Sequence, residues 1–252
     1  MRLVQLRADH RPALAKLLAG QAVHHILLLG RLPDLGRDPA VAFWGLLGQD
    51  GLEAVLGLAG TEWALANPRG ADLYPFAQII EARGPGRLRA EAGVAAGVAR
   101  HLRGRIESEQ GCLLVRLTPG SLSPAAPGQE EHPAKIRRLD SEEEAAPSAW
   151  LPEASPRPAR VHASFLDGQA VAAAWTEVET EGLALIGGIW TAPAHRGRGL
   201  GSSCFRALSL DLLAAGLTPQ LVYDCPVIGR LAGKLGYTPY GRWRELILRG
   251  GA

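Results

Sequence analysis

The sequence predicts an α/β (α+β) protein of two tandem domains that share one fold, each a mixed, mostly antiparallel sheet flanked by helices. Three observations predict it. The order strand, helix, hairpin, turn and helix occurs twice in the 252 residues; each half holds a turn rich in glycine and arginine; and residues 119–132 are rich in proline and glycine. A content of 47% hydrophobic residues suffices for two cores. We therefore expect domains at 1–118 and 133–252, joined by a linker at 119–132.

The first half begins with a short strand at residues 3–6 and a helix over Ala8–Gly20, in which leucines recur on one side. A hairpin follows, because the apolar runs Val41–Leu47 and Leu52–Leu58 flank the turn sequence GQDG. The other elements predicted for this half are a helix over Ala22–Leu29, a strand over Ala71–Glu81 and a strand over Cys112–Leu117.

A glycine- and arginine-rich segment, ARGPGRLRAEAGVAAGVARHLRGR, spans residues 82–105. It reads as a turn followed by a helix of small residues. Pro85 has no N–H to offer an anion, and Glu91 lies near the predicted helix start. We interpret the segment as a degenerate counterpart of a similar turn in the second half, with phosphate binding not favoured.

The second half repeats the opening pattern. AKIRRLDSEEEAA at residue 134 resembles RLVQLRADHRPAL at residue 2, and ASFLDGQAVAAAW at residue 163 resembles the earlier hairpin. A repeat of about half the chain indicates domain duplication and not a short-repeat array. The elements predicted here are strands over Arg160–Leu166, Gln169–Val178, Leu183–Thr191, Leu221–Asp224 and Arg242–Arg249, and helices over Gly199–Ala215 and Val227–Leu235.

The most informative stretch, Ile189–Phe205, reads IWTAPAHRGRGLGSSCF. It is a strand end, a basic turn with glycines at 197, 199 and 201, and then a helical pattern. Glycine permits positive φ and lets a ligand approach the backbone, and the first amides of a helix have no partner within it. The helix dipole and two arginines add positive charge, so the turn is expected to hold an anion such as phosphate.

The turn lacks the Gly-Lys-Ser/Thr ending of nucleoside triphosphate loops and the glycine spacing of dinucleotide-binding folds. The order Arg-x-x-Gly-x-Gly after a strand and x-x-Pro instead resembles the pyrophosphate loop of GCN5-related N-acetyltransferases (GNATs), over residues 133–252. The tandem arrangement with one degenerate half also resembles mycothiol synthase-like members. The resemblance implies acetyl-coenzyme A as acyl donor, with the pantetheine arm along Ile189, Trp190 and Thr191. It places the diphosphate at Arg196, Gly197, Arg198, Gly199, Leu200, Gly201 and Ser202.

Amide formation from a thioester needs a neutral amine and a proton for the leaving thiolate. Candidate bases are Glu177 and Glu179, which alternation places on one strand face, and Asp224, at a strand's carboxyl end. For either glutamate, a solvated strand end is the competing interpretation. The family's usual tyrosine acid falls at Ala232 and its frequent asparagine at Cys225, so Tyr223, Tyr237 or a water are the remaining candidate acids.

The charge balance of 27 basic and 25 acidic residues does not favour nucleic acid or a membrane as partner. Three widely spaced cysteines show no metal-ligand pattern and favour a reducing compartment, so we expect a cytoplasmic protein without a metal. We expect neither the start MRLVQLRADH nor the apolar run Ile26–Leu29 to act as a signal sequence or a membrane span. We expect a monomer or homodimer.

The resemblance thus predicts transfer of an acetyl group from acetyl-coenzyme A to a primary amine of a small molecule or peptide, by direct attack in a ternary complex. The alternative is a non-catalytic acyl-coenzyme A-binding or regulatory module, which the missing tyrosine favours. A weaker alternative is a nucleic-acid binder that uses Arg196, Arg198 and the arginines between 83 and 105.

Overall fold

A computed structural model describes residues 1–102, 104–124, 135–139 and 160–250. The chain divides into two compact units, a first unit of Met1–Leu113 with Gly241–Ala252 and a second unit of Leu114–Tyr240. This division differs from the predicted domains at residues 114–118 and 241–252. Part of the predicted linker lies outside the described residues.

The first unit is a mixed sheet in the order β1-β2-β3-β4-β5-β12. Its pairs are antiparallel except β4 with β5, which run parallel. The hairpin predicted around GQDG is confirmed by β2 and β3. The strands are β1 (Arg2–Leu6), β2 (Val41–Gly48), β3 (Gly51–Ala59), β4 (Glu62–Ala66), β5 (Gly86–Glu91) and, from the C-terminus, β12 (Thr238–Leu248).

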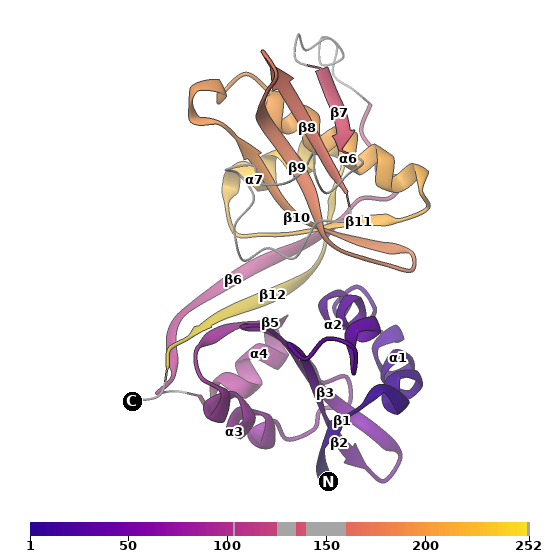
Figure 1. The fold of residues 1–252 in the computed structure, drawn as a ribbon, viewed down its shortest axis with the longest axis vertical. Helices are drawn as coiled ribbons and strands as arrows, with labels where there is room; N and C mark the ends of the chain where they lie inside the picture. The colour runs from indigo at the N-terminus through magenta and orange to yellow at the C-terminus, as the bar shows by residue number, and fades with distance from the viewer. Residues whose placement is uncertain (103, 125–134, 140–159, 251–252) are drawn as a thin grey trace. The chain divides into compact units, whose positions relative to one another are not determined.

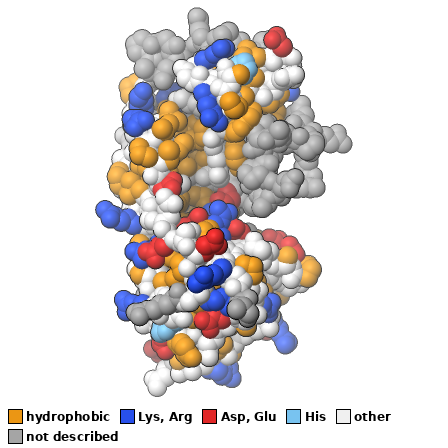
Figure 2. Space-filling view, turned by 90° about the vertical axis from the view of Figure 1, so that its left-hand side faces the viewer, with side chains coloured by type: hydrophobic (Ala, Val, Ile, Leu, Met, Phe, Trp, Pro, Cys, Tyr) orange, Lys and Arg blue, Asp and Glu red, His pale blue; other side chains and the backbone are white. Residues whose placement is uncertain are grey.

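Helices cover both faces of this sheet (Figure 1). On one face lie α1 (Arg11–Ala19) and α2 (Ile26–Arg31), which confirm the first predicted helix and part of the second. On the other face α3 (Tyr74–Arg83) and α4 (Ala92–Ala99) pack with the strands into one apolar core. Side chains of both charges are mixed over the lower part of the face shown in Figure 2, which the first unit forms.

Two predictions for the first unit are wrong. Ala71–Glu81 is not a strand, because the buried Leu73, Phe76, Ala77 and Ile80 recur at helical spacing and Pro75 occupies the first turn of α3. The presumed glycine turn before α4 is strand β5, whose residues pair with β4 on one side and β12 on the other. Glu91 ends β5 and caps α4.

The second unit repeats this plan in the order β11-β10-β9-β8-β7, again with one parallel pair, β10 with β11. The strands and helices predicted for this half on described residues are present in it, except the strand at Arg242–Arg249, which lies in the first unit. They are β7 (Lys135–Leu139), β8 (Val161–Leu166), β9 (Gln169–Thr180), β10 (Leu183–Thr191), α6 (Leu200–Ala214), β11 (Thr218–Tyr223) and α7 (Pro226–Leu235). Gly236 ends α7 in the left-handed conformation, with φ of 93°.

The last strand of the chain does not stay with the second unit. Residues Trp243–Leu248 of β12 pair with Gly86–Glu91 of β5, so the C-terminal strand completes the first unit's sheet. Strand β6 (Ile106–Arg116) begins in the first unit and enters the second, where the Leu117 amide donates to the Pro219 carbonyl. Each half of the sequence therefore lends a strand to the other half.

Two findings bear on the predicted environment. Cys112, Cys204 and Cys225 are all free thiols. Among the described residues, every helix is too short or too polar to cross a membrane. The compartment itself stays a prediction.

Candidate functional site

The parallel strands β10 and β11 separate before β10 ends. Among the described residues their ladder joins Leu183–Ile186 to Thr218–Leu221, whereas β10 continues to Thr191. Beyond Ile186, the edge of β10 that faces away from β9 is not paired with β11. A sheet opened in this way offers backbone N–H and C=O groups to an extended ligand at the carboxyl ends of parallel strands.

The turn between β10 and α6 is built to expose amides. Gly197 and Gly199 have φ of 77° and 79°, a conformation that glycine adopts without strain. No side chain caps α6, and no acidic residue lies in its first turn. In the described part of the chain, the amides of Gly197, Leu200 and Ser202 find no backbone acceptor outside the helix, and first-turn amides have none within it. These features suit an anion.

The third glycine of the turn has a packing role. A Cβ built on Gly201 would lie 2.5 Å from Thr191 Oγ1 and 3.5 Å from Ile189 Cγ2. Gly201 therefore lets the start of α6 lie directly against the end of β10. Ile189 and Thr191 face this helix. Trp190 packs on the opposite face of the sheet, against an apolar cluster made of Leu139, Val161, Ala163, Ala173 and Trp175. Trp190 can thus reach a ligand at this edge only through its backbone.

The basic residues of the turn are exposed. Arg196 is tied back to β10, since its Nε donates to the Thr191 carbonyl at 3.2 Å. His195 is half-buried and sits one residue before it. The predicted coenzyme-binding residues Arg196 to Ser202 thus lie together on one continuous turn and helix start.

The topological counterpart of this turn in the first unit is Asn67–Leu73, between β4 and α3. It is closed. The Asn67 side chain accepts from the Ala71 amide at 2.7 Å and donates to the Ala71 carbonyl at 2.9 Å, and Asp72 Oδ1 accepts from the Tyr74 amide. The amides are already engaged, and Asp72 brings negative charge to the helix start, so this turn does not favour phosphate. The sequence pattern predicts this counterpart at residues 82–105 instead, and the x-Pro pair that follows the strand in both units, Asn67-Pro68 and Ala192-Pro193, is the signal that could have located it.

Glu179 belongs to a half-buried charge network on the α6 face of the sheet. Its carboxylate accepts from Arg160 Nε at 3.2 Å and from Thr176 Oγ1 at 3.0 Å. Arg160 also contacts Asp211 of α6 at 3.2 Å, and His162 Nε2 lies 3.1 Å from the same carboxylate. Burial alone would raise the pKa of Asp211, but the hydrogen bonds from His162 and Arg160 and the nearby arginine charges lower it.

We expect Arg160→Met to destabilise the fold by about 3 kcal/mol, because it leaves Glu179 and Asp211 half-buried without their shared cation. For Asp211, whose folded pKa is lowered, the stabilising contribution is present above the unfolded pKa and is lost as the pH falls through the folded pKa. Urea denaturation at pH 7 and pH 3 measures both effects. The penalty of Asp211→Asn should shrink at pH 3, and exposed Arg37→Met should cost little.

Glu177 lies on the other face. The register between β9 and β10 shifts around this residue, and Thr176 and Glu179 share a hydrogen bond although they are three residues apart. Glu177 and Glu179 therefore do not share a face, contrary to the expectation from simple alternation. Glu177 lies opposite Gly187, where a built Cβ would meet Glu177 Cβ at 2.8 Å.

Tyr223 ends β11 and rests against α7. A Cβ built on Gly229 would lie 2.8 Å from Tyr223 Cε2 and 3.1 Å from its Oη, so Gly229 provides the space for this ring. Asp224 and Cys225 follow on an exposed connection to α7. Tyr223 and Asp224 thus lie just beyond Leu221, the last β11 residue that is paired with β10.

Neither the position of the family's tyrosine nor Tyr237 offers an accessible proton donor. Ala232, at the position of the family's tyrosine, is buried. Tyr237 is also buried, its ring stacks on Phe205, and its hydroxyl lies 2.8 Å from Ser209 Oγ. Burial raises the pKa of Tyr237 despite the Ser209 hydrogen bond, so it stays protonated in the core.

The sequence profile of the acetyltransferase (GNAT) family matches residues 128–222, the segment that carries β7 to β10, the open turn, α6 and most of β11. The second unit contains a GNAT-family domain. No curated protein sequence matches the chain significantly.

Solved structures extend the GNAT fold to the whole chain. A tandem GNAT protein from the clavulanic acid biosynthesis pathway aligns over 100% of this chain and 99% of its own, with TM-score 0.62 and 15% identity. A GCN5-related N-acetyltransferase-like protein from Streptococcus suis aligns over 97% and 100%, with TM-score 0.65 and 16% identity. A GCN5-related N-acetyltransferase from Kribbella flavida aligns over 79% and 88%, with TM-score 0.58 and 20% identity. The chain therefore has the fold of a tandem GNAT protein.

Proposed function

We propose that the second unit transfers an acetyl group from acetyl-coenzyme A to a primary amine of a small molecule or peptide, in a complex that holds both substrates. One observation carries the proposal: among the described residues, the amides of Gly197, Leu200 and Ser202 have no backbone acceptor outside the helix, no acidic residue lies in the first turn of α6, and the end of β10 beside this turn is not paired with β11. The turn fits a diphosphate, and the strand edge fits the amide-bearing pantetheine arm.

The residues around the separated strands suit direct transfer. Glu177 would take a proton from the ammonium form of the acceptor, so that the nitrogen lone pair attacks the thioester carbonyl carbon. The C–N bond forms and the C–S bond breaks, and Tyr223 gives its phenolic proton to the departing thiolate. The nitrogen then loses a second proton as the amide forms. Of the two protons that the nitrogen has released, one restores the Tyr223 phenol and the other passes to solvent. Asp224 is exposed and is an alternative base.

Titration calorimetry with acetyl-coenzyme A, followed by a thiol-release assay over a panel of amines, peptides and aminoglycosides, tests the proposal. We expect a micromolar dissociation constant, about 8 kcal/mol of binding free energy, and thiol release accelerated by at least one amine. Binding without transfer across the panel would instead favour the non-catalytic acyl-coenzyme A module.

Competition separates the coenzyme site from the nucleic-acid alternative. Free coenzyme A should displace acetyl-coenzyme A with little effect of added polynucleotide. A nucleic-acid binder would show affinity that falls steeply with salt. The mixed charges of the first unit's face in Figure 2 do not favour that alternative. The cytoplasmic location and the state of monomer or homodimer stay predictions.

A further inference from the structure

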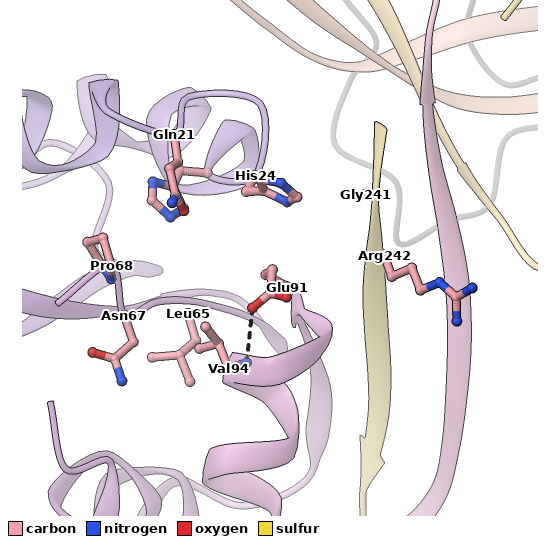
Figure 3. Close-up of a pocket in the computed structure, with 10 residues that line it drawn as sticks. Gln21, His24, Leu65, Asn67, Pro68, Glu91, Val94, Gly241 and Arg242 are labelled. Carbon is pink, nitrogen blue, oxygen red and sulfur yellow. Dashed lines mark hydrogen bonds between the residues drawn. The ribbon is translucent and has the colours of Figure 1, made fainter. Parts of the chain in front are cut away.

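A cavity of about 380 Å³ lies in the first unit at the carboxyl ends of the parallel strands β4 and β5 (Figure 3). Its polar wall includes Gln21, His24 and His25 from the α1–α2 connection, Asn67 after β4, and Glu91 after β5. In the second unit, the corresponding position is where β10 and β11 separate. In the first unit, however, Asn67 and Asp72 close the adjoining Asn67–Leu73 turn to phosphate. The first unit therefore presents a cavity without the diphosphate cradle.

Of the described residues that line this cavity, Glu91 alone carries a carboxylate. It accepts from the amides of Gly93 and Val94 at 3.2 Å, which holds it at the start of α4. Among the described residues it has no Lys or Arg partner, and Figure 3 shows the Arg242 side chain extending away from His24 and Glu91. Arg242 also lines the cavity but forms no ion pair with Glu91. A carboxylate that is fixed in a cavity and is not paired with a cation favours a positively charged ligand.

The two histidines add acceptors and not positive charge. His25 is buried and its Nδ1 lies 3.1 Å from the Leu18 carbonyl, so the proton is on Nδ1 and Nε2 carries a lone pair. Burial lowers the pKa of His25, although its backbone hydrogen bond opposes this and His24 contributes further lowering. Burial also lowers the pKa of His24, against the opposing charge of Glu91. Both rings are neutral at pH 7.

The place of His24 depends on a glycine in β12. A Cβ built on Gly241 would lie 2.5 Å from His24 Cε1 and 3.2 Å from its Nε2. The imidazole therefore lies against the β12 backbone, and any side chain at position 241 would displace the ring from this place. Leu65, Pro68 and Val94 supply an apolar part of the wall.

We propose that this cavity binds a small organic ammonium ion with a short apolar chain. Its ammonium hydrogens would be met by Glu91 and by neutral acceptors such as His25 Nε2, and its chain by Leu65 and Val94. The volume lies at the small end of ligand pockets. A resident metal is not the better occupant, because no group of three or more His, Cys, Asp or Glu in the described residues is arranged to hold one.

Three probes of equal chain length test the charge preference: butylammonium, butyrate and butanol. Each is titrated into the full-length protein without coenzyme, and the histidine ring signals are followed by NMR. We expect butylammonium to shift the His24 and His25 signals with a millimolar dissociation constant, and butyrate and butanol to bind at least tenfold more weakly. Equal or tighter binding of butyrate would overturn the proposal. Because no coenzyme is present, this outcome is separate from the fate of the acetyltransferase proposal.

Variants locate the site. Glu91→Gln keeps the size of the side chain and should weaken butylammonium at least tenfold. Asp38→Asn is its matched control, since Asp38 also accepts a backbone amide, from Ala40 at 2.8 Å, but lies outside the cavity. Gly241→Ala should weaken binding through the displaced His24 ring, whereas Gly104→Ala meets no atom within 4 Å and should not. Binding unchanged in a folded Glu91→Gln or Gly241→Ala protein would refute the site, and each variant serves if the other fails to fold.

Discussion

Replacing Gly199 by valine should weaken acetyl-coenzyme A binding by at least about a hundredfold. Gly199 has φ of 79° and precedes the first residue of α6, and a β-branched residue is strained in that conformation by more than 1 kcal/mol. If the backbone holds, the branched side chain covers the amides; if it relaxes, the amides turn away. Loss of two charge-assisted hydrogen bonds, at about 1.5 to 3 kcal/mol each, accounts for the hundredfold or larger effect. Calorimetry with acetyl-coenzyme A measures it.

Gly216→Val separates a ligand effect from strain. Gly216 follows the other end of α6, has φ of 75°, and a Cβ there meets nothing within 4 Å. Both variants should lower the melting temperature by similar amounts, while only Gly199→Val should lose affinity. If the two proteins bound acetyl-coenzyme A within threefold of one another, the turn would not be the coenzyme site.

The turn itself could be predicted because its determinants are local. Positive-φ glycines, a strand before and a helix after all lie within Ile189–Phe205, and the structure has each of them. The first unit's counterpart was misplaced because residues 82–105 matched the composition, arginine with glycine, and not the position between two parallel strands. Asn67–Leu73 holds that position with a different composition.

The pairing of strands that are far apart in the chain could not be predicted, because the hydrophobic pattern of a strand does not identify its partner. Residues Arg242–Arg249 alternate as a strand should, but alternation does not indicate whether β12 pairs with β5 or within its own half. The same limit applies to Glu177 and Glu179. A period of two predicts a common face, and the register shift between β9 and β10 depends on how both strands meet, which no single strand encodes.

Tyr223→Phe should lower the rate of thiol release by about a hundredfold while acetyl-coenzyme A binds as before, if this phenol protonates the thiolate. The structural reason for this role is that the Tyr223 ring, at the end of β11, packs against α7. Gly229, against which the ring lies, is three residues before Ala232, so the two positions share one face of the helix. The Tyr223 hydroxyl therefore lies one helical turn from the position at which the family's tyrosine stands.

Tyr237→Phe is the matched control, because it removes a hydroxyl in the same unit that hydrogen-bonds Ser209 in the core. It should cost about 1 kcal/mol of stability and leave the rate unchanged. Gly229→Ala provides a second route, since its methyl group would push the Tyr223 ring off α7 and should slow thiol release without removing the phenol. If Tyr223→Phe kept the full rate while Gly229→Ala lost it, α7 would matter for shape alone, and water would be the proton source for the thiolate.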